Sequence, residues 1–274
     1  MTAMRLHCDG RLDIDVPIAE YIPDLRIYKS DLGKSITVRH LLSHTAGFPK
    51  EYTPIGPRDE SALEASLRKE ICDIEPAYTP CLGYLYSNLG YRLASLIMQR
   101  ATGKPYSALA RELILEPLNM SRTTFDLCVA ATYPLALPHE IGKDGVARVI
   151  HQINENATRL AAGGLYSPTA DITKLIRCLI NGGKADNGVE VLPESAINEM
   201  LTQHALADND ANTGYGLGML ILRPENKILY GHTGSAPPYS SAMLFDPEAR
   251  RGAVVMVNTS AEKLARRIAL NILK

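Results

Sequence analysis

Two short segments of this chain combine residue types that could carry out acyl chemistry. One is Tyr86-Ser87-Asn88, and the other runs from His232 to Ser235. A tyrosine hydroxyl can relay a proton, and in an extended segment Tyr86 and Asn88 point to the same side. A strand can offer a backbone N–H to a developing oxyanion, a fixed donor worth about 10²–10³ in rate. The two segments are therefore candidates for the walls of one catalytic site.

Acyl transfer also needs a nucleophile, and one arrangement that supplies it is a Ser-x-x-Lys on a helix, where both side chains share a face. The chain contains this pattern at Ser66–Lys69 and at Ser260–Lys263. The first lies in a polar predicted helix and the second follows the last predicted strand, so we expect neither to serve. Ser87 should point away from its two neighbours, and we interpret it as structural.

A histidine pair, His40 and His44, offers a competing interpretation. The two are four positions apart, so a helix would place them on one face, as in a zinc hydrolase. However, the segment lacks the glutamate of His-Glu-x-x-His, and Gly47 follows too closely for a long helix. We interpret both histidines as core and capping residues, with a metal-dependent hydrolase as the minor alternative. We predict no metal and no cofactor.

The elements that must position these residues change character along the chain. Helical patterns with Pro/Gly-rich connections predict a helical lobe over about 37–200, and β-branched apolar runs predict an antiparallel meander over about 213–258. A terminal helix, 261–274, follows. We therefore predict a single α+β domain over residues 1–274, an antiparallel sheet with flanking helices plus the lobe. The other predicted helices span 1–7, 37–43, 59–72, 89–102, 106–115, 169–180 and 193–203.

Composition excludes several classes of function. The chain of 274 residues has a formal net charge of −1 and no long basic block, which argues against nucleic acid or a membrane as partner. No apolar run approaches the ~18 residues of a membrane span, and no export signal is visible. We expect a cytoplasmic protein if Met1 is the true start. The five cysteines form no CxxC pair, which indicates reduced, structural thiols.

Several longer segments resemble hallmark segments of the serine β-lactamase-like family, and they occur in the family order through almost the whole chain. That family includes class C β-lactamases, DD-peptidases and related esterases. The resemblance implies a β-lactamase/transpeptidase-like fold and hydrolysis of an acyl ester or amide through an acyl-enzyme. The segments are ITVRHLLSHTAGFP (36–49), YLYSNLGYRLASLI (84–97), ILEPLNM (114–120), AAGGLYSPTADITKL (161–175) and YGHTGS (230–235).

The resemblance also implies roles for individual residues. Tyr86 would be the catalytic tyrosine that handles the proton of the nucleophile, and Asn88 would hydrogen-bond the substrate amide. The substrate would be a small acyl compound: a β-lactam, a D-amino-acid peptide or an ester. A histidine in place of the usual lysine of the third motif favours an esterase or peptidase-like parent. The substrate-binding third motif, on the other wall, comprises His232, Thr233 and Gly234, with the backbone N–H of Ser235 as one oxyanion donor.

The sequence departs from the family at its start. The family's Ser-x-x-Lys helix leads into Gly-Lys/Arg-Leu-Asp, which is here Gly10–Asp13. Counting back places the nucleophilic serine and its lysine before Met1, so we expect an N-terminally truncated domain. Without that lysine, Tyr86 is only ~0.1% ionised at pH 7.

Two expectations follow from this departure. We expect no significant hydrolase activity from the chain as written, and the alternative to a truncated enzyme is a pseudo-enzyme that binds acyl or peptide ligands. The strands that usually precede the Ser-x-x-Lys helix would be missing as well. The last strand, Ala253 to Asn258, would then be an apolar exposed edge that favours self-association.

Overall fold

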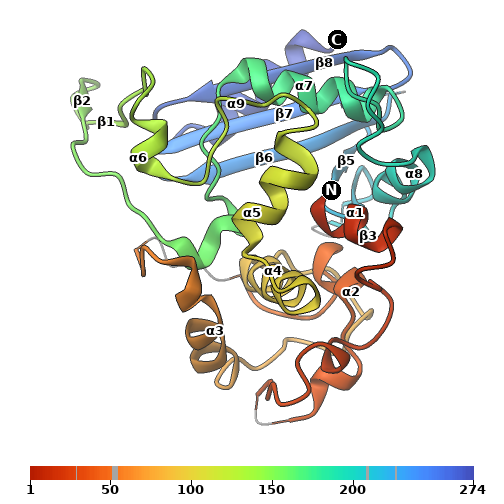
Figure 1. Cartoon of the computed structure of the whole chain (residues 1–274). Coiled ribbons are helices and arrows are strands. Elements are labelled where there is room, and N and C mark those ends of the chain that lie inside the picture. Colours follow the sequence, from red (N-terminus) through yellow and green to blue (C-terminus); the bar gives the residue numbers. More distant parts are fainter. Residues whose placement is uncertain (29, 51–54, 208–209, 226) are drawn as a thin grey trace.

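A six-stranded antiparallel sheet forms the upper part of the molecule in Figure 1. The computed structural model describes residues 1–28, 30–50, 55–207, 210–225 and 227–274. Within these residues the strand order is β3-β4-β5-β6-β7-β8, and each strand pairs antiparallel with the next. This confirms the predicted meander. The strands are β3 (Ala205–Leu206), β4 (Thr213–Tyr215), β5 (Leu220–Leu222), β6 (Leu229–Ala236), β7 (Tyr239–Asp246) and β8 (Arg251–Val257).

Helices form a lobe below the sheet (Figure 1), in agreement with the predicted α+β class. The longest helix, α4 (Asn88–Thr102), buries Leu93 and Ile97, and it ends at Gly103, whose φ of 70° suits a left-handed cap. Its amphipathic spacing is what the sequence pattern detected. The remaining α-helices are α1 (Thr2–Cys8), α2 (Val38–Leu42), α3 (Leu63–Ile71), α5 (Tyr106–Ala110), α6 (Leu127–Ala130), α7 (Thr169–Ile180), α8 (Glu194–Leu201) and α9 (Glu262–Ile272).

The two faces of the sheet are covered by different helices. Successive side chains of a strand point to opposite faces, so neighbours on β7 enter different cores. Leu244 packs with Ala269 of α9, whereas Phe245 belongs to the main core together with Ile176 of α7. The main core continues into the lobe through α4 and through Leu6 of α1. The main hydrophobic core is therefore continuous between the sheet and the lobe, and the core under α9 is separate from it.

Sequence patterns did not predict a small hairpin, β1 (His139–Ile141) and β2 (Ala147–Val149), nor the two-residue strand β3. The hairpin strands are largely exposed on both faces. A strand that buries neither face has no reason to alternate apolar and polar residues, so it carries no period-2 pattern.

A helix with the length and apolar character of a membrane span is not found among the described residues.

Strand β8 lies at an edge of the sheet, as expected for the segment 253–258. It pairs with β7 along Arg251–Val257, and within the described residues no strand pairs with its other side. Just past its end, the backbone N–H of His139 donates to the carbonyl of Asn258 at 2.7 Å. Because Met256 on this strand is 38% exposed, the edge offers apolar surface as well as backbone groups.

A buried arginine ties the lobe to the segment that enters the cleft described below. Arg92 on α4 is 1% exposed, and its Nη1 atom lies 2.5 Å from Oε2 of Glu70 on α3. Its Nε atom donates to the carbonyl of Thr158 at 3.1 Å, and Nη2 donates to Ser66. Burial raises the pKa of Glu70, but the hydrogen bonds from Arg92 and Ser66 outweigh this and lower it. Arg92 therefore holds the 3₁₀ segment Ala157–Ala162 against the lobe.

Replacing Arg92 with alanine should lower the free energy of unfolding by about 3 kcal/mol, because the Thr158 carbonyl and the Glu70 carboxylate lose a buried charged partner. Urea unfolding followed by circular dichroism measures this change. Arg111→Ala is the control, since the Arg111–Glu116 pair is 73% and 58% exposed and should contribute less than about 1 kcal/mol. Equal losses in the two variants would contradict a structural role for Arg92.

Candidate functional site

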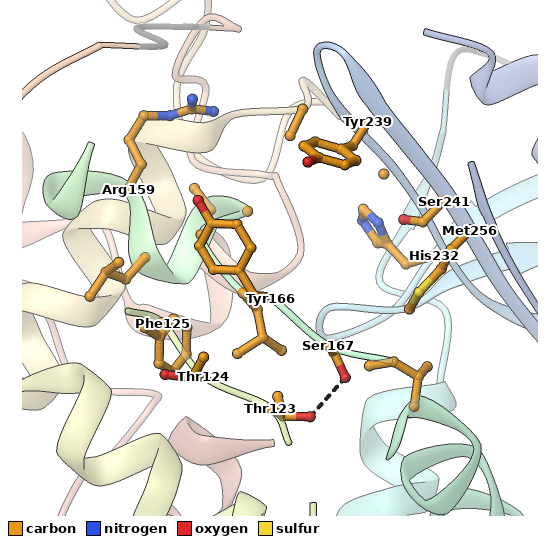
Figure 2. A pocket seen from close by; sticks show the side chains of 18 of the residues that line it. Thr123, Thr124, Phe125, Arg159, Tyr166, Ser167, His232, Tyr239, Ser241 and Met256 are labelled. Atoms are coloured by element: carbon orange, nitrogen blue, oxygen red, sulfur yellow. Dashed lines mark hydrogen bonds between the residues drawn. The ribbon is translucent and has the colours of Figure 1, made fainter. Parts of the chain in front are cut away.

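A cleft of about 2680 Å³ lies between the lobe and the sheet. Figure 2 shows part of it, with Arg159 and Tyr166 on the lobe side and His232, Tyr239, Ser241 and Met256 on the sheet side. The structure brings every residue of the predicted site to this one cleft, although the two motifs are more than 140 positions apart. The predicted residues that line it are Tyr86, Asn88, His232, Thr233, Gly234 and Ser235.

The Tyr86 segment is held in place by its own helix cap and by a histidine. Ser87 is the N-cap of α4, in extended backbone, and its hydroxyl accepts the N–H of Gly90 at 3.2 Å. The N–H of Ser87 donates to Nδ1 of His44 at 3.1 Å. The carbonyl of His44 in turn accepts the N–H of Leu85 at 2.9 Å. The structural interpretation of Ser87 is therefore confirmed.

His44 lies at the centre of an aromatic cluster. It is 2% exposed and adopts a φ of 59°, a left-handed conformation that is uncommon outside glycine. Its ring centroid lies 4.2 Å from that of Tyr86, 4.7 Å from Tyr215 and 5.0 Å from Tyr91. Burial, and next the proximity of His232, lower the pKa of His44 well below its ordinary value. A neutral His44 thus positions the segment that carries Tyr86.

The histidine pair hydrogen-bonds to backbone groups. His40 completes a capping box at the start of α2, where its Nδ1 atom accepts the N–H of Thr37 at 3.1 Å. The Nδ1 atom of His44 accepts the N–H of Ser87. Among the described residues no three His, Cys, Asp or Glu side chains are arranged to hold a metal ion. The core and capping interpretation of both histidines is confirmed.

His232 is fixed on β6 by a hydrogen bond at each ring nitrogen. Its Nδ1 atom lies 2.5 Å from the carbonyl of Thr233, so this nitrogen carries the proton. Its Nε2 atom, 2.9 Å from the Tyr215 hydroxyl, is then the acceptor. Burial lowers the pKa of His232, although the Thr233 carbonyl and the charge of Glu262 oppose the shift. His232 is therefore a neutral ring that lines the wall. From the sequence Tyr215 is recognisable only as part of a predicted strand, and no motif indicates its contact with His232.

Tyr86 remains protonated despite positive charge nearby. Burial raises the pKa of Tyr86, the charge of Glu262 raises it further, and Arg159 lowers it less strongly. The ammonium of Lys50 lies 5.9 Å from the centroid of its ring. Neither Lys50 nor Arg159 belongs to a recognisable motif, so the sequence alone does not place a cation at the cleft. The charge of Arg159 favours ionisation of Tyr86, but desolvation outweighs it.

The lobe side of the cleft is built by two segments that are close only in the fold. Figure 2 shows the Tyr166 hydroxyl directed to the side of Arg159, and the hydroxyl of its neighbour Ser167 lies 2.7 Å from that of Thr123. Buried Asp171 on α7 accepts the Thr123 hydroxyl at 2.9 Å, which anchors this wall. Gly163, with a φ of 126°, turns the chain from the Arg159 segment into the Tyr166 segment.

The serine and the lysine of each Ser-x-x-Lys sequence lie outside the cleft lining. Ser66 on α3 donates to Glu70 at 2.6 Å and accepts from Arg92, so its hydroxyl belongs to the buried ion pair of the lobe. Ser260 precedes α9 and, like Lys263, is not among the residues that line the cleft. The expectation that neither sequence supplies a nucleophile to this cleft agrees with their positions.

The Beta-lactamase family model matches residues 1–274, and the chain belongs to this family. Protein flp of Staphylococcus aureus (strain COL) is 24% identical over 267 residues, which cover 96% of this chain and 51% of that protein. The chain thus spans about half the length of this curated relative.

Solved structures show the same fold. The octameric penicillin-binding protein homologue from Pyrococcus abyssi superposes with a TM-score of 0.82 at 24% identity, covering 99% of this chain and 62% of that one. A D-stereospecific amidohydrolase from Streptomyces sp. superposes with a TM-score of 0.78 at 24% identity, covering 98% and 82%. The predicted β-lactamase/transpeptidase-like fold is confirmed.

Stability should fall as the pH drops below about 6.5, because the unfolded His44 binds a proton there and the buried, neutral His44 does not. Between pH 6 and pH 5 the wild type should lose about 1 kcal/mol more than His44→Asn. Asparagine tolerates the left-handed backbone and can accept the Ser87 N–H, but it does not titrate. Urea unfolding at each pH measures the difference. His151→Gln, at an exposed histidine, should lose as much unfolding free energy between pH 6 and pH 5 as the wild type. An equal loss in His44→Asn would refute the assignment of this pH dependence to His44.

Proposed function

We propose that this chain binds small acyl or amide compounds in the cleft and, by itself, does not hydrolyse them at a significant rate. The observation that carries the proposal is the convergence of Tyr86, Asn88, His232 and Ser235 on one cleft. The D-stereospecific amidohydrolase named above has the same fold, which supports an amide as one substrate class. In this proposal Asn88 holds the amide, His232 lines the facing wall, and the N–H of Ser235 meets the carbonyl oxygen.

The proposed lack of turnover rests on the state of Tyr86. A general base must be able to take a proton near the working pH, and burial moves the pKa of Tyr86 in the wrong direction for this. Removing the nucleophile of a serine hydrolase lowers turnover by about 10⁶. The serine and lysine side chains of the two Ser-x-x-Lys sequences are not among the residues that line the cleft. In this proposal the cleft can therefore bind a substrate without catalysing its hydrolysis.

Two interpretations of such a chain differ in origin. It is part of an active serine hydrolase, an esterase or peptidase-like enzyme whose serine and lysine lie before Met1, or it is a pseudo-enzyme that binds without turnover. In-frame coding sequence for a Ser-x-x-Lys shortly upstream of Met1 would decide for the active enzyme, and stop codons there for the pseudo-enzyme.

The purified chain should bind neutral N-acetyl-D-phenylalanine amide yet hydrolyse p-nitrophenyl acetate only at the background rate. Isothermal titration calorimetry measures the binding, and the absorbance of p-nitrophenol measures turnover. Asn88→Leu should weaken binding about tenfold, since the amide loses a hydrogen-bond partner in a half-enclosed site. Leu137→Asn, at an exposed residue outside the cleft lining, is the control. Saturable turnover that a serine-directed phosphonate abolishes would contradict the proposed inactivity.

The exposed edge of β8 leads to a proposal about assembly. We propose that two copies of the chain associate through this edge, since unpaired strand edges template pairing. The octameric state of the Pyrococcus abyssi homologue makes self-association a reasonable expectation for this fold. Sedimentation velocity should show mass increasing with protein concentration, and Val255→Pro on β8 should reduce it by breaking the edge. The matched variant Val149→Pro lies on the hairpin strand β2 and should leave association unchanged. A monomer at all concentrations would refute the proposal.

A further inference from the structure

Glu262 places a carboxylate beside the third motif. It is the first residue of α9, and its Oε1 atom accepts the hydroxyl proton of Thr233 at 2.6 Å. Both side chains are half-buried and both line the cleft. The start of α9 is itself anchored, because the N–H of Ala261 donates to the hydroxyl of buried Ser240 at 2.8 Å. The carboxylate is therefore held at a defined place on the wall.

The charge of Glu262 reaches both sides of the cleft. Next to burial it is the main influence that raises the pKa of Tyr86 on the lobe side. On the sheet side it raises the pKa of His232 and so opposes the lowering caused by burial. Other charged groups face the cleft from farther along the same wall and from the lobe. Arg266 lies one turn along α9, is exposed and acts on Asp210, whereas Arg159 and Lys50 stand on the Tyr86 side.

The contact with Thr233 changes what this part of the wall can bind. A threonine hydroxyl has one proton to donate, and here Glu262 accepts it, so the hydroxyl does not offer it to a substrate carboxylate. A second carboxylate next to Glu262 would meet like charge in a half-buried site, where screening by water is weak. A carboxylate has about four acceptor positions, and Thr233 uses one of them. An ammonium group would find both opposite charge and acceptors.

We propose that Glu262 makes this end of the cleft select amide or ester substrates that carry an ammonium group and reject those that carry a carboxylate. This inference rests on the proposed function, which places an acyl or amide compound in the same cleft. The selecting group is the α9 carboxylate on the Thr233 side, and Arg266 at the exposed rim is screened by solvent. Glu262 is a specificity-determining residue in this proposal and takes no part in bond breaking.

Three probes with a common phenylalanyl body test the selection. D-Phenylalanine amide carries an ammonium, N-acetyl-D-phenylalanine carries a carboxylate, and N-acetyl-D-phenylalanine amide is neutral. Calorimetric titration of the purified chain should give at least about tenfold tighter binding of the ammonium probe than of the carboxylate probe. Glu262→Gln, which can still accept from Thr233, should reduce this ratio to about threefold or less. The matched control Glu248→Gln removes the same charge from an exposed residue outside the cleft and should keep the ratio.

Salt and folding measurements complete the test. In the wild type the preference should shrink as sodium chloride is added, because the selection is electrostatic. Thermal unfolding verifies that Glu262→Gln folds, and the salt dependence of the wild type stands as evidence independent of any variant. The inference is overturned if the carboxylate probe binds as tightly as the ammonium probe or more tightly, or if the ratio is unchanged in Glu262→Gln. In either case, binding of the neutral probe would still support the proposed function. If none of the three probes binds, the proposed function fails, and the inference fails with it.

Discussion

The hydrogen bond from the backbone N–H of Ser87 to Nδ1 of buried His44 is the interaction on which the cleft depends. It requires a neutral ring, because a protonated imidazole has no acceptor at that atom. The same ring contacts Tyr86 from the lobe and Tyr215 from the sheet. Tyr215 in turn fixes His232 through its hydroxyl. One buried, uncharged side chain therefore sets the positions of residues on both walls.

Desolvation dominates the electrostatics of this region. Tyr86 has Arg159 and Lys50 in its surroundings, yet its pKa is raised, and the pKa values of His44 and His232 are lowered. Each shift favours the neutral form, as expected where burial outweighs the neighbouring charges. The inner cleft is thus lined by neutral hydrogen-bonding groups. Glu262 differs because it lies half-buried at the start of α9, beside Thr233 of β6, where a charge keeps contact with solvent.

Elements with a strong period were predictable, and those without one were not. The apolar repeat of α4 reflects burial of one face, and the apolar runs of β6 to β8 reflect a sheet that is covered on both faces, so both could be read from the residue pattern. The exposed hairpin β1–β2 buries neither face and left no such pattern. Among the residues of the cleft, Tyr86 and Asn88 stood out through a short motif. Arg159 and Glu262 belong to no motif, and their importance comes from neighbours distant in sequence.

The sequence by itself determined the α+β class, the family and the two motifs that line the cleft, because these depend on local periodicity and on short runs of residues. It also indicated that neither Ser-x-x-Lys sequence supplies the nucleophile, and their serine and lysine residues do not line the cleft. The tertiary structure decided which side chains surround those motifs and in which protonation state. Burial and the distances between charges arise only when α9, β6 and the Tyr86 segment converge. Desolvation and Coulomb interactions depend on those distances in space and not on separation along the chain.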